Sequence, residues 1–362
     1  MRLLFDAVKS GDLEAVKTHL EAVPVGRWDT DNAGNTPLHI AFKPKYNKAL
    51  NIFYEFDITS DVFNQRNNDG YSILHYAAQQ KNLDWTKKIL SCPEIDIDTE
   101  NLYGNTPFML SVINNELKIA ELLKDKNADI NHSNHKKWTA LHFTASKGLL
   151  ECSEQLIKWG AKLDMKNNFG ATPLIRASIN GNVQIVECLL KHDVDVNSLD
   201  INKWTSVHHA AKRGHINILR LLLERKAEVD GVNESGNTPL IIACLNNSPE
   251  AVGILLDHHA DVNFRSNQGT TALDIATREK HNDCTSIIEK KIREKHLTLS
   301  NTYQAVGILR NNDDFRDEED IIESMREKKN HEWGNMPRKS KNAKNWKRGR
   351  QSEMADKEFS HN

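Results

Sequence analysis

The sequence predicts an all-α solenoid of stacked helix pairs, and three observations support this prediction. A threonine or serine that suits a helix N-cap recurs at spacings of 36, 34 and then 33 residues. Two short amphipathic helices follow each cap, and neither buries its apolar stripe without a neighbouring pair. Hydrophobic residues make up only 38% of the 362 residues, which suits a thin stack with much exposed surface. The eight caps are Thr36, Ser72, Thr106, Thr139, Thr172, Thr205, Thr238 and Thr271.

The stretch from Asn168 to Asn202 shows how one unit is built. Thr172 suits the N-cap of the first helix, and Pro173 suits the next position because a missing N–H costs nothing in the first turn. Asn180-Gly181 predicts the end of this helix. A second helix follows, with an apolar stripe formed by Val183, Val186, Leu189 and Leu190. After this helix, a polar extended loop leads to the next cap at Thr205.

At its caps the chain resembles the ankyrin-repeat family, whose signature begins Thr-Pro-Leu-His. The first full unit reads Thr36-Pro37-Leu38-His39-Ile40-Ala41, and looser copies stand at Ser72–Ala77, Thr139–His142 and Thr205–His208. Second helices carry matching runs such as Ile185–Leu190. The resemblance covers roughly residues 1–295. It implies stacked helix pairs joined by β-hairpin-like loops, and it says little about function.

Four regions follow from where the repeats begin and end. Residues 1–30 are interpreted as an N-terminal capping half-repeat with a polar outer face. Residues 31–295 hold the array of eight registers, which closes with a polar helix over Cys284–Lys295. Residues 296–334 are predicted to form a partly helical linker. Residues 335–362 form a basic tail that we predict to be disordered.

Two lysines occupy a loop position that is glycine in the other registers. Lys137 and Lys203 stand where the other six registers have glycine, at a position that often needs a positive φ. This backbone conformation costs a residue with a Cβ on the order of 1 kcal/mol. A tryptophan follows each lysine (Trp138 and Trp204), so packing of the indole is expected to offset the strain.

Composition limits the classes of function. The net charge of −2 gives the whole chain no strong attraction to nucleic acid or membranes. None of the five cysteines belongs to a Cys-x-x-Cys pair, which favours buried, reduced thiols of an intracellular protein. No apolar run reaches the length of a membrane span. We therefore expect a monomer in the cytoplasm, with the nucleus as a second location, and no membrane contact.

The histidines indicate structure rather than chemistry. His39, His75, His142 and His208 recur at one place in the repeat, so each imidazole is expected to tie its hairpin to the next by hydrogen bonds. No phosphate-binding loop, nucleophile elbow or His-Glu-x-x-His helix is present in the sequence. We therefore expect no enzyme activity, no cofactor and no metal.

The predicted interaction surface is a concave groove between the loop tips and the exposed side of the first helices. Its rim carries aromatic side chains that the fold does not need to bury, and such side chains are candidates for binding. The alternative is that each tryptophan packs on the next hairpin. The candidate protein-binding residues are Tyr71, Tyr103, Ile113, Lys136, Trp138, Phe169, Ile179, Trp204, Lys212 and Leu245.

Two further sets of residues suggest modification and transport. Asn131, Asn197 and Asn263 resemble the sites that ankyrin repeats offer to asparaginyl hydroxylase, because each has Asp two residues and Leu eight residues before it. Simple hydrogen bonding within the loop is the alternative. The tail holds a cationic cluster that suits a nuclear-import signal, a nucleic-acid contact or a solubilising segment. Its cationic residues are Arg338, Lys339, Lys341, Lys344, Lys347, Arg348 and Arg350.

These features favour a non-catalytic scaffold or adaptor that binds a partner peptide or domain in its concave groove. Two alternatives stay open. One is a nuclear regulatory factor whose basic tail contacts nucleic acid. The other is a pathogen effector that uses the same repeats on host proteins.

Overall fold

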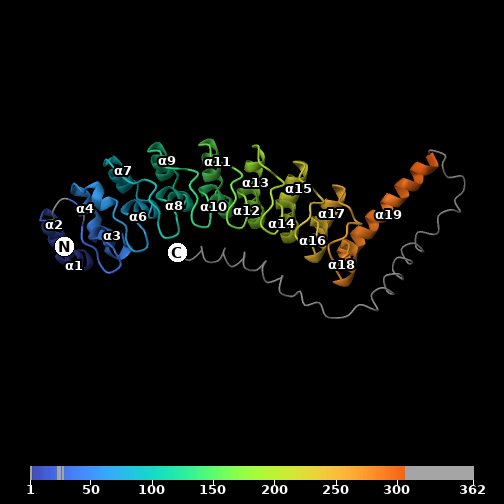
Figure 1. The fold of residues 1–362 in the computed structure, drawn as a ribbon, viewed down its shortest axis with the longest axis horizontal. Helices are drawn as coiled ribbons and strands as arrows, with labels where there is room; N and C mark the ends of the chain where they lie inside the picture. The colour runs from blue at the N-terminus through green and yellow to red at the C-terminus, as the bar shows by residue number, and fades with distance from the viewer. Residues whose placement is uncertain (1, 23–25, 27, 306–362) are drawn as a thin grey trace.

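The computed structural model describes the backbone of residues 2–22, 26 and 28–305, and the side chains of these residues as far as Lys295. The described chain forms an elongated array in which the first helices of the pairs make one row and the second helices make another (Figure 1). We call them inner and outer helices. Loops between successive pairs project on the side of the inner helices (Figure 1). No strand occurs in the described ranges, and the predicted all-α solenoid is confirmed.

The helix bounds follow the predicted repeat. The inner helices are α3 (Pro37–Ala41), α6 (Ile73–Gln79), α8 (Pro107–Ile113), α10 (Ala140–Lys147), α12 (Pro173–Asn180), α14 (Ser206–Arg213), α16 (Pro239–Leu245) and α18 (Ala272–Arg278). The outer helices are α4 (Leu50–Glu55), α7 (Leu83–Ser91), α9 (Leu117–Asp125), α11 (Leu150–Lys158), α13 (Val183–Leu190), α15 (Ile216–Glu224), α17 (Pro249–Asp257) and α19 (Asn282–Ala305). Before them stand α1 (Arg2–Ser10) and α2 (Leu13–Glu21).

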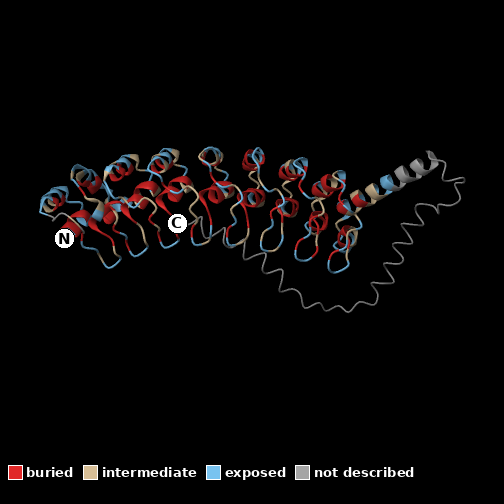
Figure 2. Cartoon of the chain, turned by 45° about the horizontal axis from the view of Figure 1, so that its top comes forward, coloured by how far each residue is buried: buried red, intermediate tan, exposed pale blue. Residues whose placement is uncertain are grey.

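The core runs as one continuous layer between the helices. Buried residues line the facing sides of the two rows, whereas the loop tips and the outer helix backs are exposed (Figure 2). Each helix pair covers the apolar stripes of the next, which is why no pair needs a core of its own. The five cysteines are free thiols, and four of them are buried, in line with the predicted packing role.

Two kinds of helix start alternate from the third register onward, when registers are numbered 1–8 from Thr36 to Thr271. In registers 3, 5 and 7 a proline follows the cap, and the third helical residue is apolar: Met109, Ile175 and Ile241. In registers 4, 6 and 8 Ala or Ser follows the cap, and the side chain of the third residue returns a hydrogen bond to the cap backbone: His142, His208 and Asp274. In all six registers the cap hydroxyl accepts the N–H of the third helical residue, and the return bond to the cap backbone is the feature that alternates.

The buried histidines confirm their predicted structural role. In each case Nε2 donates to a backbone carbonyl of the next loop: His39 to Tyr71 (2.9 Å), His75 to Asn105 (3.0 Å), His142 to Ala171 (3.0 Å) and His208 to Asn237 (3.1 Å). Burial disfavours the charged imidazolium and lowers the pKa of each of these histidines to about 4. All four side chains are thus neutral at pH 7.

Two kinds of joint between neighbouring repeats alternate with the helix starts. From an even to an odd register, the joint combines a histidine with a loop aspartate whose carboxylate accepts a backbone N–H of the next repeat: Asp98 from Asp129, Asp164 from Asp195 and Asp230 from Asp261. From register 3 to 4 and from 5 to 6, a loop asparagine takes this place. Its Oδ1 accepts the N–H of Lys162 at Asn131 (2.8 Å) and of Glu228 at Asn197 (2.9 Å). We call them the His–Asp joint and the Asn joint.

The structure departs from the predicted elements at both ends of the array. In the first register, the expected irregular turn is a 3-10 helix, η1 (Pro44–Ala49), and an additional short helix, α5 (Ser60–Phe63), was not predicted. The closing helix α19 was predicted over Cys284–Lys295 but begins at Asn282 and continues to Ala305, projecting from the end of the array (Figure 1). The sequence of α19 contains neither proline nor glycine, so nothing stops the helix where its packing against the array ends.

The loop position predicted to need a positive φ has one. Lys137 and Lys203 have φ of 56° and 58°, close to the 70° of Gly170. At Gly170 the next loop is also near, because an ideal Cβ there would lie 2.8 Å from the backbone nitrogen of Ile201. Successive loops are therefore stacked backbone against backbone at this register.

Candidate functional site

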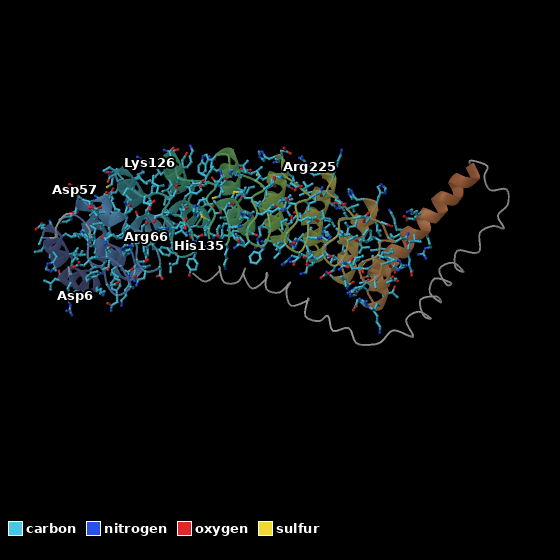
Figure 3. The ribbon with its side chains drawn as sticks, viewed as in Figure 1. Asp6, Asp57, Arg66, Lys126, His135 and Arg225 are labelled. Carbon is cyan, nitrogen blue, oxygen red and sulfur yellow. The ribbon has the colours of Figure 1, made fainter. Side chains whose placement is uncertain are left out.

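The inner face of the array is the corner between the loops and the exposed side of the inner helices. The residue just before a cap lies against its own inner helix: the rings of Trp138 and Phe143 are 5.0 Å apart, and those of Trp204 and His209 are 5.2 Å apart. Figure 3 shows how side chains divide between the two edges of the array. Arg66 and His135 lie on the loop side, and Lys126 and Arg225 lie on the side of the outer helices.

Trp138 does not stand exposed on the rim, and this part of the prediction is wrong. Only 7% of its surface is exposed, because it forms a small apolar cluster with Met109 and Phe143, against Ile113 and apart from the main core. The guanidinium of Arg176, from the next repeat, lies over the indole at 4.7 Å from the ring centroid. The alternative that the tryptophan is used in packing between repeats holds at this position.

Trp204 has a related but more open environment. Its half-buried ring lies against His208 and His209, and the Nζ of Lys212 stands 5.5 Å from the ring centroid. His209 is held in turn by Asp200, with 2.9 Å between Nε2 and the carboxylate. The same carboxylate accepts the backbone N–H of Trp204, so the loop and the helix are fixed to each other.

The other predicted rim residues differ in exposure. Tyr103 is 53% exposed, whereas Phe169 is half-buried and Tyr71 packs between His75 and Tyr76, with both ring centroids 5.4 Å away. Ile113 and Leu245 are partly buried against the core, and Ile179 and Lys136 are half-buried. The inner face thus offers separate apolar contacts rather than one continuous aromatic row.

Two exposed apolar side chains at the loop tips were missed from the sequence. Leu102 is 62% exposed and Ile201 is 57% exposed. The signal was available, because the same tip position is polar in registers 2, 4, 5, 7 and 8: Asn68, His135, Asn168, Glu234 and Asn267. The tips of registers 3 and 6 therefore present hydrophobic side chains where the fold accepts polar ones.

Positive charge collects on the inner face of registers 4–6. The loop-to-inner-helix segments 134–147, 167–180 and 200–213 contain seven lysine or arginine residues and a single carboxylate, that of Asp200. The remaining parts of the same repeats, 148–166, 181–199 and 214–232, contain seven cationic and nine acidic residues. Registers 2, 3 and 7 have no cationic residue in the corresponding segments. The seven cations are Lys136, Lys137, Lys147, Arg176, Lys203, Lys212 and Arg213.

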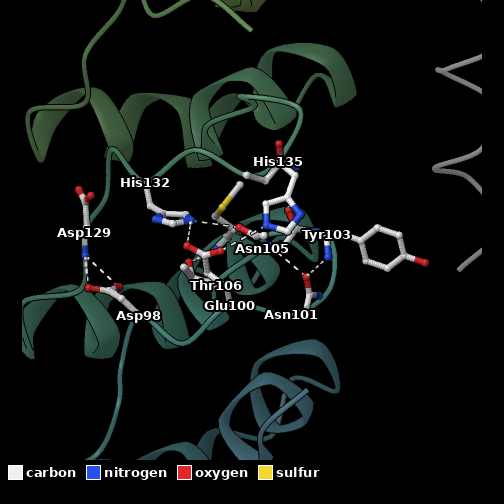
Figure 4. Close-up of polar contacts among 12 residues, drawn as sticks. Asp98, Glu100, Asn101, Tyr103, Asn105, Thr106, Asp129, His132 and His135 are labelled. Carbon is white, nitrogen blue, oxygen red and sulfur yellow. Dashed lines mark hydrogen bonds and ion pairs between the residues drawn. The ribbon is translucent and has the colours of Figure 1, made fainter. Parts of the chain in front are cut away.

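A second polar cluster lies on the loops of registers 3 and 4. Glu100 stands between two histidines, with 3.5 Å from its carboxylate to Nε2 of both His132 and His135 (Figure 4). Nε2 of His132 also donates to the carbonyl of Gly104 at 3.0 Å. An open, mostly polar pocket of about 730 Å³ adjoins Glu100, Leu102 and His135. Within the described ranges, no group of three or more His, Cys, Asp or Glu side chains is arranged to hold a metal ion.

The candidate hydroxylation sites differ in how their side chains are used. Asn131 and Asn197 hold the next repeat through their Oδ1 atoms, as the Asn joint describes. Asn263 is exposed, and among its described contacts is the donation of its backbone N–H to Asp261. The loop-bonding alternative therefore accounts for two of the three asparagines.

The tail residues lie outside the described part of the chain. This applies to the whole candidate import cluster, Arg338, Lys339, Lys341, Lys344, Lys347, Arg348 and Arg350, and to most of the linker predicted over 296–334. A cytoplasmic or nuclear location stays a prediction. Among the described helices, none combines the length and the apolar character needed to cross a bilayer.

Comparison with known proteins agrees with the geometry. The family model for ankyrin repeats in three copies matches residues 4–101, 86–167, 141–233 and 226–296. The human "Transient receptor potential cation channel subfamily A member 1" is 26% identical over 182 residues, or 48% of this chain and 16% of that protein. The mouse "B-cell lymphoma 3 protein homolog" is 30% identical over 151 residues, or 41% of this chain and 33% of that protein.

A fungal relative shows the same partial match. The "Ankyrin repeat protein nuc-2" of Neurospora crassa is 29% identical over 208 residues, or 54% of this chain and 19% of that protein. The chain therefore spans a third or less of the length of these relatives. The repeat period, the caps, the histidine links and the family match over residues 4–296 together show that this chain belongs to the ankyrin-repeat family.

Proposed function

We propose that this protein acts as a scaffold or adaptor that binds a protein partner on the inner face of registers 3–6, without catalysis of its own. The observation that carries the proposal is the exposure of apolar side chains at loop tips where the fold requires none, at Leu102, Tyr103 and Ile201. Ankyrin repeats generally mediate protein–protein interaction and are generally non-catalytic, which supports the same conclusion.

Site-specific photo-cross-linking tests the proposal in the full chain. A benzophenone side chain placed at Tyr103 or Phe169 is expected to give covalent protein adducts in an extract of the source cells. The same group at Glu187 or Arg220, which are exposed on outer helices, is the matched control and is expected to give none. Adducts that form only at the outer positions would place the interaction on the other side of the array and end this proposal.

Phe169→Ala separates a binding role from a packing role. Phe169 is half-buried in its loop, so the substitution is expected to lower stability only slightly. If the ring is a binding hot spot, affinity for the cross-linked partner falls by about 2 kcal/mol or more. Lys226→Ala, at an exposed site after α15, is the control and should change neither quantity. A sharp drop in Tm with unchanged affinity per folded molecule would identify Phe169 as ordinary repeat packing.

We also propose Asn263 as the first of the three asparagines to be hydroxylated in a cell that has an asparaginyl hydroxylase. The side chains of Asn131 and Asn197 each accept a hydrogen bond from the next repeat, and an enzyme that takes either side chain into its active site has to break that bond. Peptide mass spectrometry of the native protein is therefore expected to show higher occupancy at Asn263 than at the other two sites. Equal occupancy at all three would show that the Asn joint does not protect them.

A further inference from the structure

We infer that the inner face of registers 4–6 takes an extended acidic segment of the protein partner, with apolar residues between its carboxylates. This inference rests on the proposed function and specifies the chemistry of the partner. It starts from the separation of charge within three adjacent repeats, where the inner segments hold seven cations and one carboxylate, in a chain whose net charge is only −2. Such a patch attracts anions locally although the whole protein does not.

Three of the seven cations of this face have side-chain contacts that fix their position. Arg176 is only 4% exposed, lies over the Trp138 ring and donates from Nη2 to the Ser146 hydroxyl at 3.3 Å. Lys212 lies over Trp204, and Lys147 donates to the carbonyl of Ile113 at 3.2 Å. Cations whose side chains are already positioned lose less conformational entropy when they bind a carboxylate. A preorganised cationic surface therefore favours charge-assisted hydrogen bonds with an anionic partner.

The one carboxylate in these segments, that of Asp200, is engaged within its own repeat. Asp200 accepts the backbone N–H groups of Asn202 and Trp204, both at 2.9 Å, and contacts His209 at 2.9 Å. Its oxygen atoms are thus directed into its own loop and helix.

The aromatic residues favour a peptide over a nucleic acid. Non-specific binding of single-stranded nucleic acid relies on aromatic faces on which bases stack. On this surface Trp138 is buried under Arg176, and Trp204 is covered by Lys212 on one side and by His208 and His209. The rings therefore present cations instead of open stacking platforms. Half-buried Phe169 and Ile179 supply apolar contacts between the charges, which suits a segment that alternates carboxylates with hydrophobic residues.

The spacing of the helices sets the length of the bound segment. Neighbouring packed helices lie about 8–10 Å apart, so α10 and α14 are separated by roughly 20 Å. An extended peptide rises about 3.3 Å per residue, so about six residues cross the three repeats. A dodecapeptide is therefore long enough to contact all three inner helices.

Fluorescence anisotropy with the full chain and three synthetic probes tests the inference. The first probe is a labelled dodecapeptide that alternates Glu with Leu and Phe, the second replaces every Glu by Gln, and the third is a twelve-nucleotide oligouridine. At 150 mM salt we expect the Glu peptide to bind at least ten times more tightly than either of the others. Equal binding of the Gln peptide, or tighter binding of oligouridine, would overturn the inference.

Two charge-matched variants locate the effect. Lys136→Ala/Lys203→Ala/Lys212→Ala removes three cations from the inner face, and Lys158→Ala/Lys191→Ala/Arg225→Ala removes three exposed cations from the outer side. The inner variant is expected to weaken binding of the Glu peptide at least tenfold, and the outer variant less than twofold. Equal losses would show diffuse charge attraction and overturn the inference. The cross-links at Tyr103 and Phe169 do not depend on these probes, so their persistence would leave the proposed function standing even if the acidic preference fails.

Discussion

Acidification from pH 7 to pH 4.5 is expected to cost the array about 2.5 kcal/mol of unfolding free energy for each of its four buried histidines. The pKa of His39, His75, His142 and His208 is about 4 in the folded protein, against 6.5 for an unperturbed imidazole. Between these values the unfolded chain binds protons that the folded chain does not bind. The contribution of these histidines to the unfolding free energy is therefore fully present above about pH 6.5, and it is lost as the pH drops towards 4.

Three carboxylates act in the opposite direction. Burial raises the pKa of Asp98, Asp164 and Asp230 above the usual range, so their protonation favours the folded state in acid. They offset part of the loss from the histidines. Their contribution cancels when a histidine variant that keeps all three aspartates is compared with the unaltered protein.

The chain itself supplies the variant that isolates the histidine effect. Ala140→Pro/His142→Ile gives register 4 the helix start of register 5, where Pro173 and Ile175 stand. Urea unfolding at pH 7, 5.5 and 4.5 is expected to show a pH dependence about 2.5 kcal/mol smaller than in the unaltered protein. Gln184→Ala, at an exposed position of α13 that carries no titratable group, is the control and should leave the pH dependence unchanged. An unaltered slope in the register 4 variant would show that the buried histidines are not the groups that titrate.

Replacement of Gly170 by Ala is expected to destabilise the array by about 3 kcal/mol. Two costs combine at this position. Its φ of 70° is unfavourable for any residue with a Cβ, and the added carbon would lie 2.8 Å from the nitrogen of Ile201 and 3.0 Å from the carbonyl carbon of Asp200. Because these are backbone atoms, the whole next loop must move to make room.

Gly269 provides the matched control in the last loop. Its φ is 73°, but no atom lies within 4 Å of an ideal Cβ there. Gly269→Ala is therefore expected to cost only about 1 kcal/mol, the price of the backbone conformation alone. The difference between the two variants, measured by chemical denaturation, reports the close approach of neighbouring loops. Equal losses would mean that the loop contact at Gly170 relaxes without cost.

The regular part of the fold could be predicted from the sequence because each of its signals is local. Thr172 followed by Pro173 fixes a helix start within two residues, and the recurrence of such starts fixes the stack. The histidine links could also be predicted, since their period equals that of the repeat. The helices η1 and α5 of the first register could not be predicted, because they depend on how a longer connection packs against its neighbours and not on a local sequence signal.

The candidate site was harder to predict because it depends on contacts between repeats. Trp138 looked like an exposed loop aromatic, but it is covered by Arg176, which stands in the next repeat and carries no aromatic or loop signal of its own. Exposure of Ile201 was open to prediction by comparing registers at the tip position. Sequence patterns within one repeat predict its helices and caps, whereas the burial of a side chain between two repeats also depends on which residues the neighbouring repeat carries.

The alternation of His–Asp and Asn joints has a consequence for how such an array can change in length. Deleting registers 5 and 6 together would bring register 4 against register 7. His142 and Asp164 of register 4 would then meet the backbone groups of register 7 that His208 and Asp230 of register 6 bind now. Deleting register 5 alone would set two repeats of the same kind against each other. The unit that can be inserted or deleted in this array is thus a pair of consecutive repeats. Insertions or deletions of an even number of repeats preserve the alternation of His–Asp and Asn joints.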